Sequence, residues 1–242
     1  MNIVVKGSVE EFDRAAAREV AKQVISKPDS VICLATGDTT LGMCAEIVRI
    51  YLECGLDFSK VVSFNLDEYV GISVNDPVSC SARITEQLFR HLNIKRENIH
   101  FPGSCSDVLL QECALYENKI LQAGGIDLEV LSIGKNGHIA FNEPGTPFHT
   151  TTRIADISPS TVEAKKSLFG SADNVPKKGI TMGLKTIMMA DRVLLMAKGK
   201  DKAGIIKKAL FGPITTSVPA SILQLHPRLI VLLDRAAAAK IL

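Results

Sequence analysis

The chain has 242 residues, of which 46% are hydrophobic and 22% are charged, and 28 Lys and Arg against 26 Asp and Glu give a formal charge of +2. This high apolar content with a small net charge excludes intrinsic disorder, and the scattering of basic residues among acidic ones excludes a nucleic-acid footprint. Aromatic residues make up only 5%, with no Trp, so we expect no base-stacking platform and no aromatic sugar shelf. The length suffices for an ample core, and we expect one domain over residues 1–242 with a small-molecule partner.

Cysteine usage and the N-terminal residues indicate the compartment. Six cysteines are present without a C-x-x-C pair, so neither a zinc site nor a thioredoxin-like site is predicted. The first ten residues lack the apolar stretch of an export signal, and no apolar run approaches the roughly 18 residues of a membrane helix. We therefore expect a cytoplasmic protein that does not contact a membrane.

Short runs rich in Val, Ile and Leu alternate with amphipathic stretches. In chain order the pattern predicts a helix at Val9–Ser26, a strand at Val31–Ala35, a helix at Leu41–Cys54, a strand at Val61–Leu66, helices at Ser79–His91 and Asp107–Ala123, strands at Leu128–Ile133 and Val193–Ala197, a helix at Lys200–Phe211 and a strand at Leu229–Leu233. Asp107 is a predicted N-cap, and Gly55 and the Gly124-Gly125 pair are predicted helix stops. Phe141–Lys178 is expected to form a long, partly irregular insertion.

This alternation indicates βαβ units, and the strands without polar alternation indicate burial on both faces. We therefore predict an α/β fold with a doubly wound, mostly parallel, Rossmann-like sheet and helices on both faces. Ligands of such sheets bind in the crevice beyond the carboxyl ends of the strands. Four predicted strands end near this crevice and are followed by Thr36-Gly37-Asp38-Thr39-Thr40, Asp67-Glu68, Gly134-Lys135-Asn136-Gly137-His138 and Lys198-Gly199-Lys200-Asp201-Lys202. Their convergence predicts a binding site.

Two of these segments favour an anion. The turn from Thr36 to Thr40 opens a predicted helix, where free backbone N–H groups and the helix dipole attract negative charge. It lacks the Lys-Ser/Thr pair of a Walker motif, and an ordinary β–α turn is the alternative. Lys202 lies in the first turn of another predicted helix, where a cation opposes the dipole unless an anion compensates. A solvated surface lysine is the alternative there; otherwise Lys202 adds a point charge for a phosphate monoester.

Three other residues favour proton transfer. Asp67 ends an apolar strand, where desolvation moves the pKa of a carboxylate toward the value that a general base needs, although an acidic pair such as Asp67-Glu68 is also a common cap. His138 exchanges protons near neutral pH, and Glu143 lies five residues later on a turn, where it orients the imidazole in our interpretation. A single His in such a segment is more often structural, but the Gly-His-x-x-x-Asn-Glu pattern favours catalysis.

Taken together, these segments resemble those of a known enzyme family. Leu34-Ala35-Thr36-Gly37-Asp38-Thr39, Asn65-Leu66-Asp67-Glu68-Tyr69-Val70-Gly71 and Asn136-Gly137-His138-Ile139-Ala140-Phe141-Asn142-Glu143-Pro144-Gly145 resemble the glucosamine-6-phosphate deaminase family. So do Ile180-Thr181-Met182-Gly183, Gly199-Lys200-Asp201-Lys202-Ala203 and Pro219-Ala220-Ser221-Ile222-Leu223-Gln224-Leu225-His226. The resemblance runs nearly end to end and in order. The wider group includes galactosamine-6-phosphate deaminases and, more remotely, 6-phosphogluconolactonases.

The resemblance implies a reaction that needs no metal and no other cofactor. It implies that an aminosugar 6-phosphate and water become a ketose 6-phosphate and ammonia, with no nucleic-acid or membrane partner. His138 would move a proton at the ring oxygen as the pyranose opens, and Asp67 would carry a proton from C2 to C1. Glu143 would hold the imidazole, with Asn136 as its neighbour. The resemblance assigns the phosphate and substrate contacts to Thr36, Gly37, Asp38, Thr39, Gly137 and Lys202.

The chain departs from the family at two positions near these groups. Many members have Asp where this chain has Asn136, which can hydrogen-bond His138 but cannot stabilise an imidazolium by charge. The family's Thr-Arg-x-x-Asn-x-Arg segment supplies an arginine to the phosphate, and Val162 stands in its place. Lys165 and Lys166 are the candidates to replace this arginine, although an ammonium does not reproduce a bidentate guanidinium.

Two further departures concern specificity and assembly. Cys80 replaces a usual Tyr, as in the galactosamine branch, and it either contacts the sugar or packs within its predicted helix. The chain stops shortly after Asp234, without the longer tail of allosterically regulated hexameric members. We therefore expect a monomer or small homo-oligomer without allosteric regulation.

Three functions follow from these observations. A deaminase is favoured, with glucosamine 6-phosphate preferred over galactosamine 6-phosphate as substrate. A 6-phosphogluconolactonase-like hydrolase needs no proton shuttle from C2 to C1, so the retention of Asp67 with the His138 and Glu143 pair disfavours it. A non-catalytic sugar-phosphate sensor of the kind found in transcriptional regulators carries a helix-turn-helix segment, for which the residues before Val31 leave no room. We therefore expect an enzyme.

Overall fold

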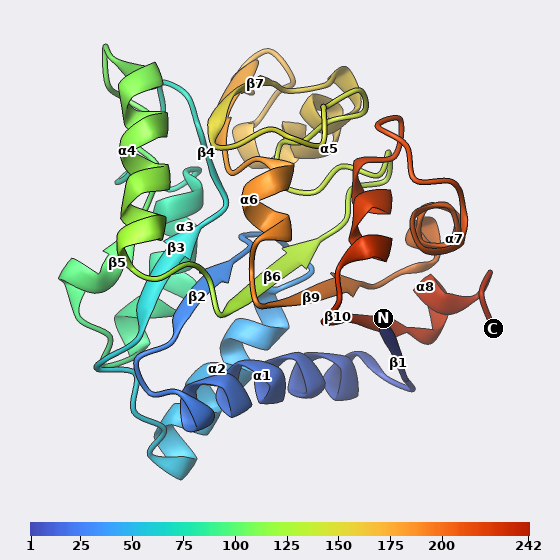
Figure 1. Cartoon of the computed structure of the whole chain (residues 1–242), viewed down its shortest axis with the longest axis horizontal. Helices are drawn as coiled ribbons and strands as arrows, with labels where there is room; N and C mark the ends of the chain where they lie inside the picture. Colours follow the sequence, from blue (N-terminus) through green and yellow to red (C-terminus); the bar gives the residue numbers. More distant parts are fainter.

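The computed structural model describes all residues, 1–242. Its main sheet has seven parallel strands in the order β1-β10-β9-β6-β2-β3-β5 (Figure 1). Their bounds are β1 Asn2–Lys6, β2 Val31–Leu34, β3 Val62–Asn65, β5 Ile99–His100, β6 Leu128–Ser132, β9 Arg192–Ala197 and β10 Leu229–Asp234. The chain winds outward from β2 to β5 and then returns to β6 on the other side of β2. The switch point of the sheet therefore lies between β2 and β6.

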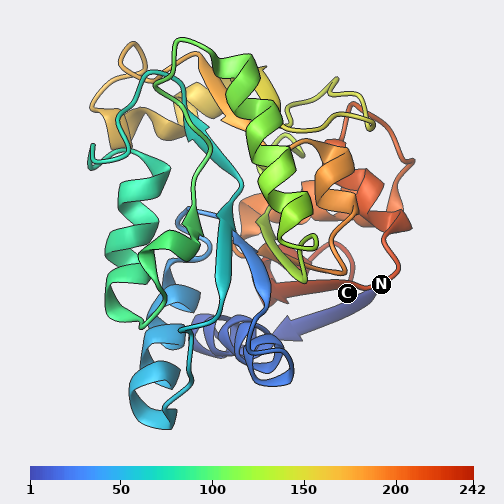
Figure 2. The ribbon, with the colours of Figure 1, turned by 60° about the vertical axis from the view of Figure 1, so that its left-hand side comes forward.

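Helices cover both faces of the main sheet, which confirms the predicted fold class. One hydrophobic cluster joins α1 (Val9–Ser26), α2 (Leu41–Cys54) and α3 (Cys80–Gln87) to one face of the sheet. The other face packs against α4 (Leu109–Gln122), α6 (Leu184–Met188), α7 (Ala203–Phe211) and α8 (Arg235–Ala238), as Figure 2 shows for α1 and α4. Because side chains alternate along a strand, Val31 and Cys33 pack in one cluster and Ile32 and Leu34 in the other.

A smaller layer lies beyond the carboxyl ends of the main strands (Figures 1 and 2). It is an antiparallel sheet in the order β4-β8-β7, with bounds β4 Asp67–Tyr69, β7 Arg153–Asp156 and β8 Lys178–Thr181. Its own core includes Tyr69, Phe141 and Val162, and α5 (Pro159–Phe169) packs there. The predicted insertion Phe141–Lys178 is partly irregular, as expected, and it contains β7, α5 and the first residue of β8.

The two layers are joined where β3 ends and β4 begins. Only Leu66 separates the two strands, and its carbonyl accepts a hydrogen bond from the N–H of Met182 at 2.7 Å, just after β8. The chain thus leaves the main sheet and enters the small one at Asp67, which places this carboxylate at the junction between the two layers.

Several sequence-based boundaries differ from the structure. The sequence missed β1, β4, β5, β7 and β8, which are short or half-buried and therefore lack a continuous apolar run. Asp107 is not an N-cap, because α4 begins after Val108 and no side chain caps it. The predicted helix Ser79–His91 is α3 followed by a 3-10 turn at Phe89–His91, and Lys200–Phe211 is a 3-10 turn at Lys200–Lys202 followed by α7. No helix combines the length and the apolar character needed to cross a membrane.

One acidic side chain lies inside the main sheet. Glu129 in β6 is fully buried, opposite Cys33 in the register of β2 and β6, and neither carboxyl oxygen has a hydrogen-bond partner. Burial raises the pKa of Glu129 to about 8, against the opposing effect of the Cys33 thiol. An unpartnered carboxylate in this sheet is strongly disfavoured, so Glu129 is protonated in the folded protein at neutral pH.

We expect Glu129→Gln to stabilise the protein at neutral and alkaline pH. The carboxyl group ionises near pH 4.5 in the unfolded chain and near pH 8 in the folded one. The stability that the protonated group provides is therefore complete below pH 4.5 and is lost as pH rises toward 8. Over this window the variant should gain on the wild type by at most about 1.4 kcal/mol per pH unit, because Gln has no proton to lose.

Urea unfolding of both proteins at several pH values across this window measures the difference. Glu97→Gln, at an exposed acidic residue, is the matched control. A difference between Glu129→Gln and the wild type that does not change with pH would contradict the expectation.

Candidate active site

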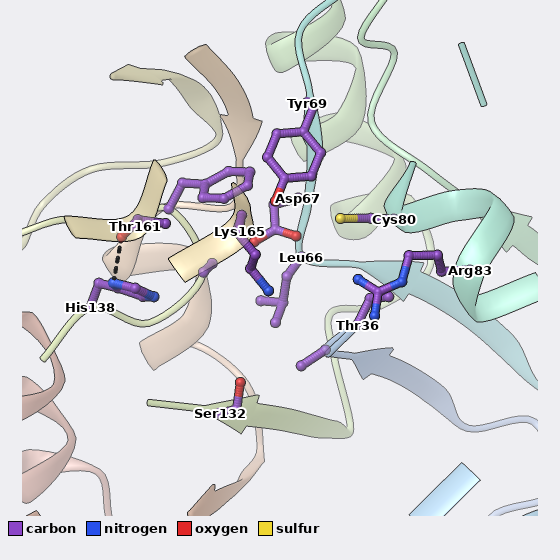
Figure 3. A pocket seen from close by; sticks show the side chains of 13 residues that line it. Thr36, Leu66, Asp67, Tyr69, Cys80, Arg83, Ser132, His138, Thr161 and Lys165 are labelled. Atoms are coloured by element: carbon purple, nitrogen blue, oxygen red, sulfur yellow. Dashed lines mark hydrogen bonds between the residues drawn. The ribbon is translucent and has the colours of Figure 1, made fainter. Parts of the chain in front are cut away.

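A pocket of about 550 Å³, partly open to solvent, lies at the carboxyl ends of β2, β3 and β6. It occupies the switch point of the main sheet and is covered by residues of the smaller layer and of α5 (Figure 3). The residues that line it are Ala35, Thr36, Leu66, Asp67, Tyr69, Cys80, Arg83, Ser132, His138, Ala140, Phe141, Thr161 and Lys165.

The carboxylate of Asp67 points into the pocket from the junction of β3 and β4 (Figure 3). Burial is the main cause that raises its pKa to about 7, and the adjacent Glu68 adds to the rise. Lys165 and the Cys80 thiol act in the opposite direction. At neutral pH both protonation states of Asp67 are therefore accessible, as proton shuttling requires.

Glu68 points the other way along β4 and does not line the pocket, which corrects its candidacy as a site residue. It is fully buried and accepts hydrogen bonds from the backbone N–H groups of Tyr69 (2.9 Å), Cys80 (3.0 Å) and Ser81 (2.9 Å) and from the Ser81 hydroxyl (2.7 Å). Glu68 thus holds the N-terminus of α3 against β4. The helix dipole favours a carboxylate at that place.

The imidazole of His138 enters the pocket from the loop after β6. Gly134 makes room for it, because a Cβ there would lie 2.2 Å from the imidazole Cε1. The ring Nδ1 lies 3.2 Å from the Thr161 hydroxyl and 3.4 Å from Glu143 Oε2. Since Thr161 donates its one proton to Glu143 Oε1 at 2.6 Å, its oxygen must accept from Nδ1–H. We infer from this network that the proton lies on Nδ1 and that Nε2 is the basic nitrogen.

Glu143 and Asn136 lie behind the imidazole and do not line the pocket. Burial alone would raise the pKa of Glu143, but hydrogen bonds from His138, Thr161 and Asn136 together with the His138 charge lower it to about 2. Asn136 donates to Glu143 Oε2 at 2.7 Å and accepts from the backbone N–H of His138 at 3.1 Å. Asn136 therefore holds the loop and the carboxylate, and it hydrogen-bonds His138, as expected, through the backbone N–H of that residue.

The predicted phosphate turn contributes mainly its backbone. Only Thr36 of this turn lines the pocket, and the Asp38 side chain is 96% exposed. The N–H groups of residues 36–39 donate no hydrogen bond within the protein. The Thr40 hydroxyl donates to two carbonyl groups of the same turn, which fixes its shape. Gly137 was predicted to contact substrate, but it lies outside the pocket, where its φ of +92° closes the His138 loop.

Of the three lysines predicted at the site, one lines the pocket and two do not. Lys165 on α5 lines the pocket, whereas Lys166 is exposed and pairs with Glu163. Lys202 does not line the pocket, but its half-buried ammonium donates to the carbonyl of Ile133 at 2.7 Å, at the end of β6. Burial lowers the pKa of Lys202, and the nearby charge of Lys165 acts in the same direction.

Sequence reasoning left Cys80 undecided and missed Arg83 and Thr161 as pocket residues. Cys80 belongs to the core of the smaller layer and also lines the pocket beside Asp67. Arg83 lies three residues further along α3, on the same helix face. This spacing from Cys80 is the only signal in the sequence that would have found it, since Arg83 belongs to no motif that follows a strand.

Comparisons with known proteins identify the family of the chain. A family model described as glucosamine-6-phosphate isomerases/6-phosphogluconolactonase matches residues 7–231. Over 241 residues the chain is 44% identical to a glucosamine-6-phosphate deaminase of Thermoanaerobacter pseudethanolicus and 45% identical to one of Clostridium botulinum. These alignments cover 100% of this chain and 95% and 99% of the two relatives.

Solved structures give the same result. The structure of a monomeric glucosamine-6-phosphate deaminase superposes with a TM-score of 0.97 at 39% identity, over 99% of this chain and 100% of that one. A 6-phosphogluconolactonase from Trypanosoma brucei superposes with a TM-score of 0.80 at 18% identity, over 100% and 98% of the two chains, and shares the fold. The family match over most of the chain and the full-length identities together show that this protein belongs to the glucosamine-6-phosphate isomerase/6-phosphogluconolactonase family.

Proposed function

We propose that the protein is a glucosamine-6-phosphate deaminase that converts glucosamine 6-phosphate and water into fructose 6-phosphate and ammonia. The observation that carries the proposal is one pocket holding two different proton-transfer groups, the Asp67 carboxyl with a pKa of about 7 and the His138 imidazole backed by an ionised Glu143. The full-length similarity to glucosamine-6-phosphate deaminases supports this choice of substrate.

His138 acts first, at the ring oxygen of the sugar. Its Nε2 moves the proton between the anomeric hydroxyl and the ring oxygen, so that the pyranose opens to the aldehyde. The imidazolium that forms for a moment is stabilised by the adjacent negative charge of Glu143. Asn136 carries no charge, so this electrostatic support comes from Glu143 alone.

Asp67 then performs the isomerisation. Its carboxylate removes the proton from C2 while O1 of the aldehyde takes a proton from the substrate's ammonium group, and the resulting enolamine is protonated at C1 by the same carboxyl group. The product is a 2-imino sugar, which water hydrolyses to the ketose with release of ammonia. A carboxyl group with a pKa near 7 suits both halves of this transfer, because it neither holds nor releases its proton too strongly. Hydrolysis of a lactone transfers no proton from C2, so a lactonase would not need the proton shuttle that Asp67 provides.

The phosphate is assigned to the side of the pocket where positive groups gather. Thr36 and Lys165 line it, the unpaired N–H groups of residues 36–39 belong to the turn that begins at Thr36, and Lys202 lies near Lys165. Backbone N–H groups at the start of a helix bind phosphate oxygens well. We further propose that the protein works in the cytoplasm as a monomer or small homo-oligomer, on phosphosugars, without a nucleic-acid or membrane partner.

Turnover of defined sugars tests the function. Purified protein is incubated separately with glucosamine 6-phosphate, galactosamine 6-phosphate and 6-phosphogluconolactone, and ammonia, ketose phosphate and acid release are measured. We expect ammonia and ketose phosphate in equal amounts, with glucosamine 6-phosphate the better substrate. Acid release from the lactone alone would favour the hydrolase, and tight binding without turnover would favour a sensor.

The role of Asp67 is tested by Asp67→Asn. The amide keeps the shape of the side chain but accepts no proton, so exchange of the C2 hydrogen with D₂O should stop while the substrate still binds. In the wild type kcat/KM should rise with pH up to about 7, because Asp67 accepts a proton only when ionised. Proton NMR follows the exchange, and exchange that continues in the variant would show that another group is the base.

Thr161 is tested as the residue that positions the imidazole. Thr161→Val keeps the shape of the side chain but removes both hydrogen bonds, and kcat should fall by about 10- to 100-fold with little change in KM. Thr161→Ser keeps the hydroxyl and should restore most of the rate. The pH dependence of kcat should shift in Thr161→Val only, and an unchanged profile in both variants would contradict this role.

A further inference from the structure

We infer that Arg83 on α3 is the guanidinium that binds the phosphate of the substrate in this chain. The inference rests on the proposed function. It gives Arg83 the role of an arginine that the family has at the position of Val162 and that this chain lacks. Val162 stands where the family's phosphate segment has arginine, and its side chain is buried in the core of the smaller layer with Tyr69 and Phe141. No cation can therefore reach the pocket from residue 162.

Arg83 is directed into the pocket by the way α3 is anchored. The Ser79 hydroxyl caps the helix by accepting from the N–H of Ala82 at 2.9 Å, and Glu68 binds the N–H groups of the first turn. Cys80 and Arg83, one turn apart, then line the pocket together. Figure 3 shows the guanidinium directed toward Thr36, the first residue of the phosphate turn.

The guanidinium of Arg83 has no firm partner in the protein. Its side chain is only 16% exposed, yet its nearest acid is Asp38 at 3.6 Å, on a side chain that is 96% exposed. Other enclosed arginines of the chain are satisfied, since Arg192 donates to Glu19 at 2.7 Å and Arg153 donates to Asn142 at 2.7 Å. An enclosed guanidinium that makes no such bond is ready for an anion with paired oxygens, which phosphate provides.

The charges around the pocket favour phosphate at Arg83. Lys165 and Thr36 line the same pocket, and the N–H groups of Thr36 and of the three residues that follow it donate no hydrogen bond within the protein. The competing carboxylate of Asp38 forms an ion pair with Arg83 at 3.6 Å, but its side chain is 96% exposed, so water weakens this attraction. Arg83 therefore supplies a bidentate contact to phosphate, which the ammonium of Lys165 cannot make. It does so from α3, a helix that carries no phosphate-binding motif.

Phosphate binding without turnover tests the inference. Inorganic phosphate is titrated by calorimetry into the wild type, Arg83→Met and Arg83→Lys. Arg90→Met is the control, because Arg90 lies just beyond α3, is exposed and pairs with Glu86. We expect Arg83→Met to weaken phosphate binding by about 10- to 100-fold and Arg83→Lys by less, with Arg90→Met unchanged. Asp38→Asn, which removes the competing carboxylate, should tighten binding by about two- to fivefold.

Steady-state kinetics supply the second measurement. Arg83→Met should raise KM for glucosamine 6-phosphate by a similar factor with little change in kcat, and should leave the affinity for unphosphorylated glucosamine, measured by the same calorimetry, unaltered. Wild-type phosphate affinity in Arg83→Met, or equal losses with both sugars, would overturn the inference. If the wild type binds phosphate through Arg83 but releases no ammonia, the proposed function fails and the phosphate site stands. Circular dichroism verifies the fold of each variant, and Arg83→Lys keeps the test decisive if Arg83→Met does not fold.

Discussion

The pocket depends on one buried carboxylate that never touches it. Glu68 accepts four hydrogen bonds, three of them from the first turn of α3, and the strand that carries it also carries Asp67. One side chain, Glu68, therefore fixes both the strand that carries Asp67 and the helix that carries Cys80 and Arg83. Buried charge of this kind is tolerated only when its hydrogen bonds are complete, so α3 and β4 must fold together.

Acidic residues in this molecule are differentiated by their surroundings. Asp67 and Glu129 are raised in pKa by burial, whereas Glu143 is lowered because three side chains donate to it. The same chemical group thus provides a proton shuttle, a neutral part of the sheet and a fixed negative charge beside an imidazole. Such divergence of pKa values within one site is how a protein assigns acid and base roles without a metal.

The sequence located one pocket residue after each of three buried parallel strands, although Gly137 and Lys202, which also follow such strands, do not line the pocket. Burial on both faces produces uninterrupted runs of Val, Ile and Leu, and the switch-point rule then located Thr36, Asp67 and His138. It was insufficient for the small antiparallel sheet, whose three- and four-residue strands have no such run. Arg83 and Thr161 were missed because each lies on a helix, and which face of a helix meets a pocket depends on packing that no local pattern reveals.

The Thr161 contact has a consequence for the order of events during turnover. His138 belongs to the main sheet, but the hydroxyl that sets its tautomer belongs to α5, which also carries Lys165 over the pocket. An imidazole without that hydroxyl loses the nearer of the two oxygens beside Nδ1 and keeps only Glu143 Oε2 at 3.4 Å. In the proposed reaction, the helix that positions the imidazole for ring opening is therefore the same helix that covers the open-chain aminosugar and shelters it from bulk water.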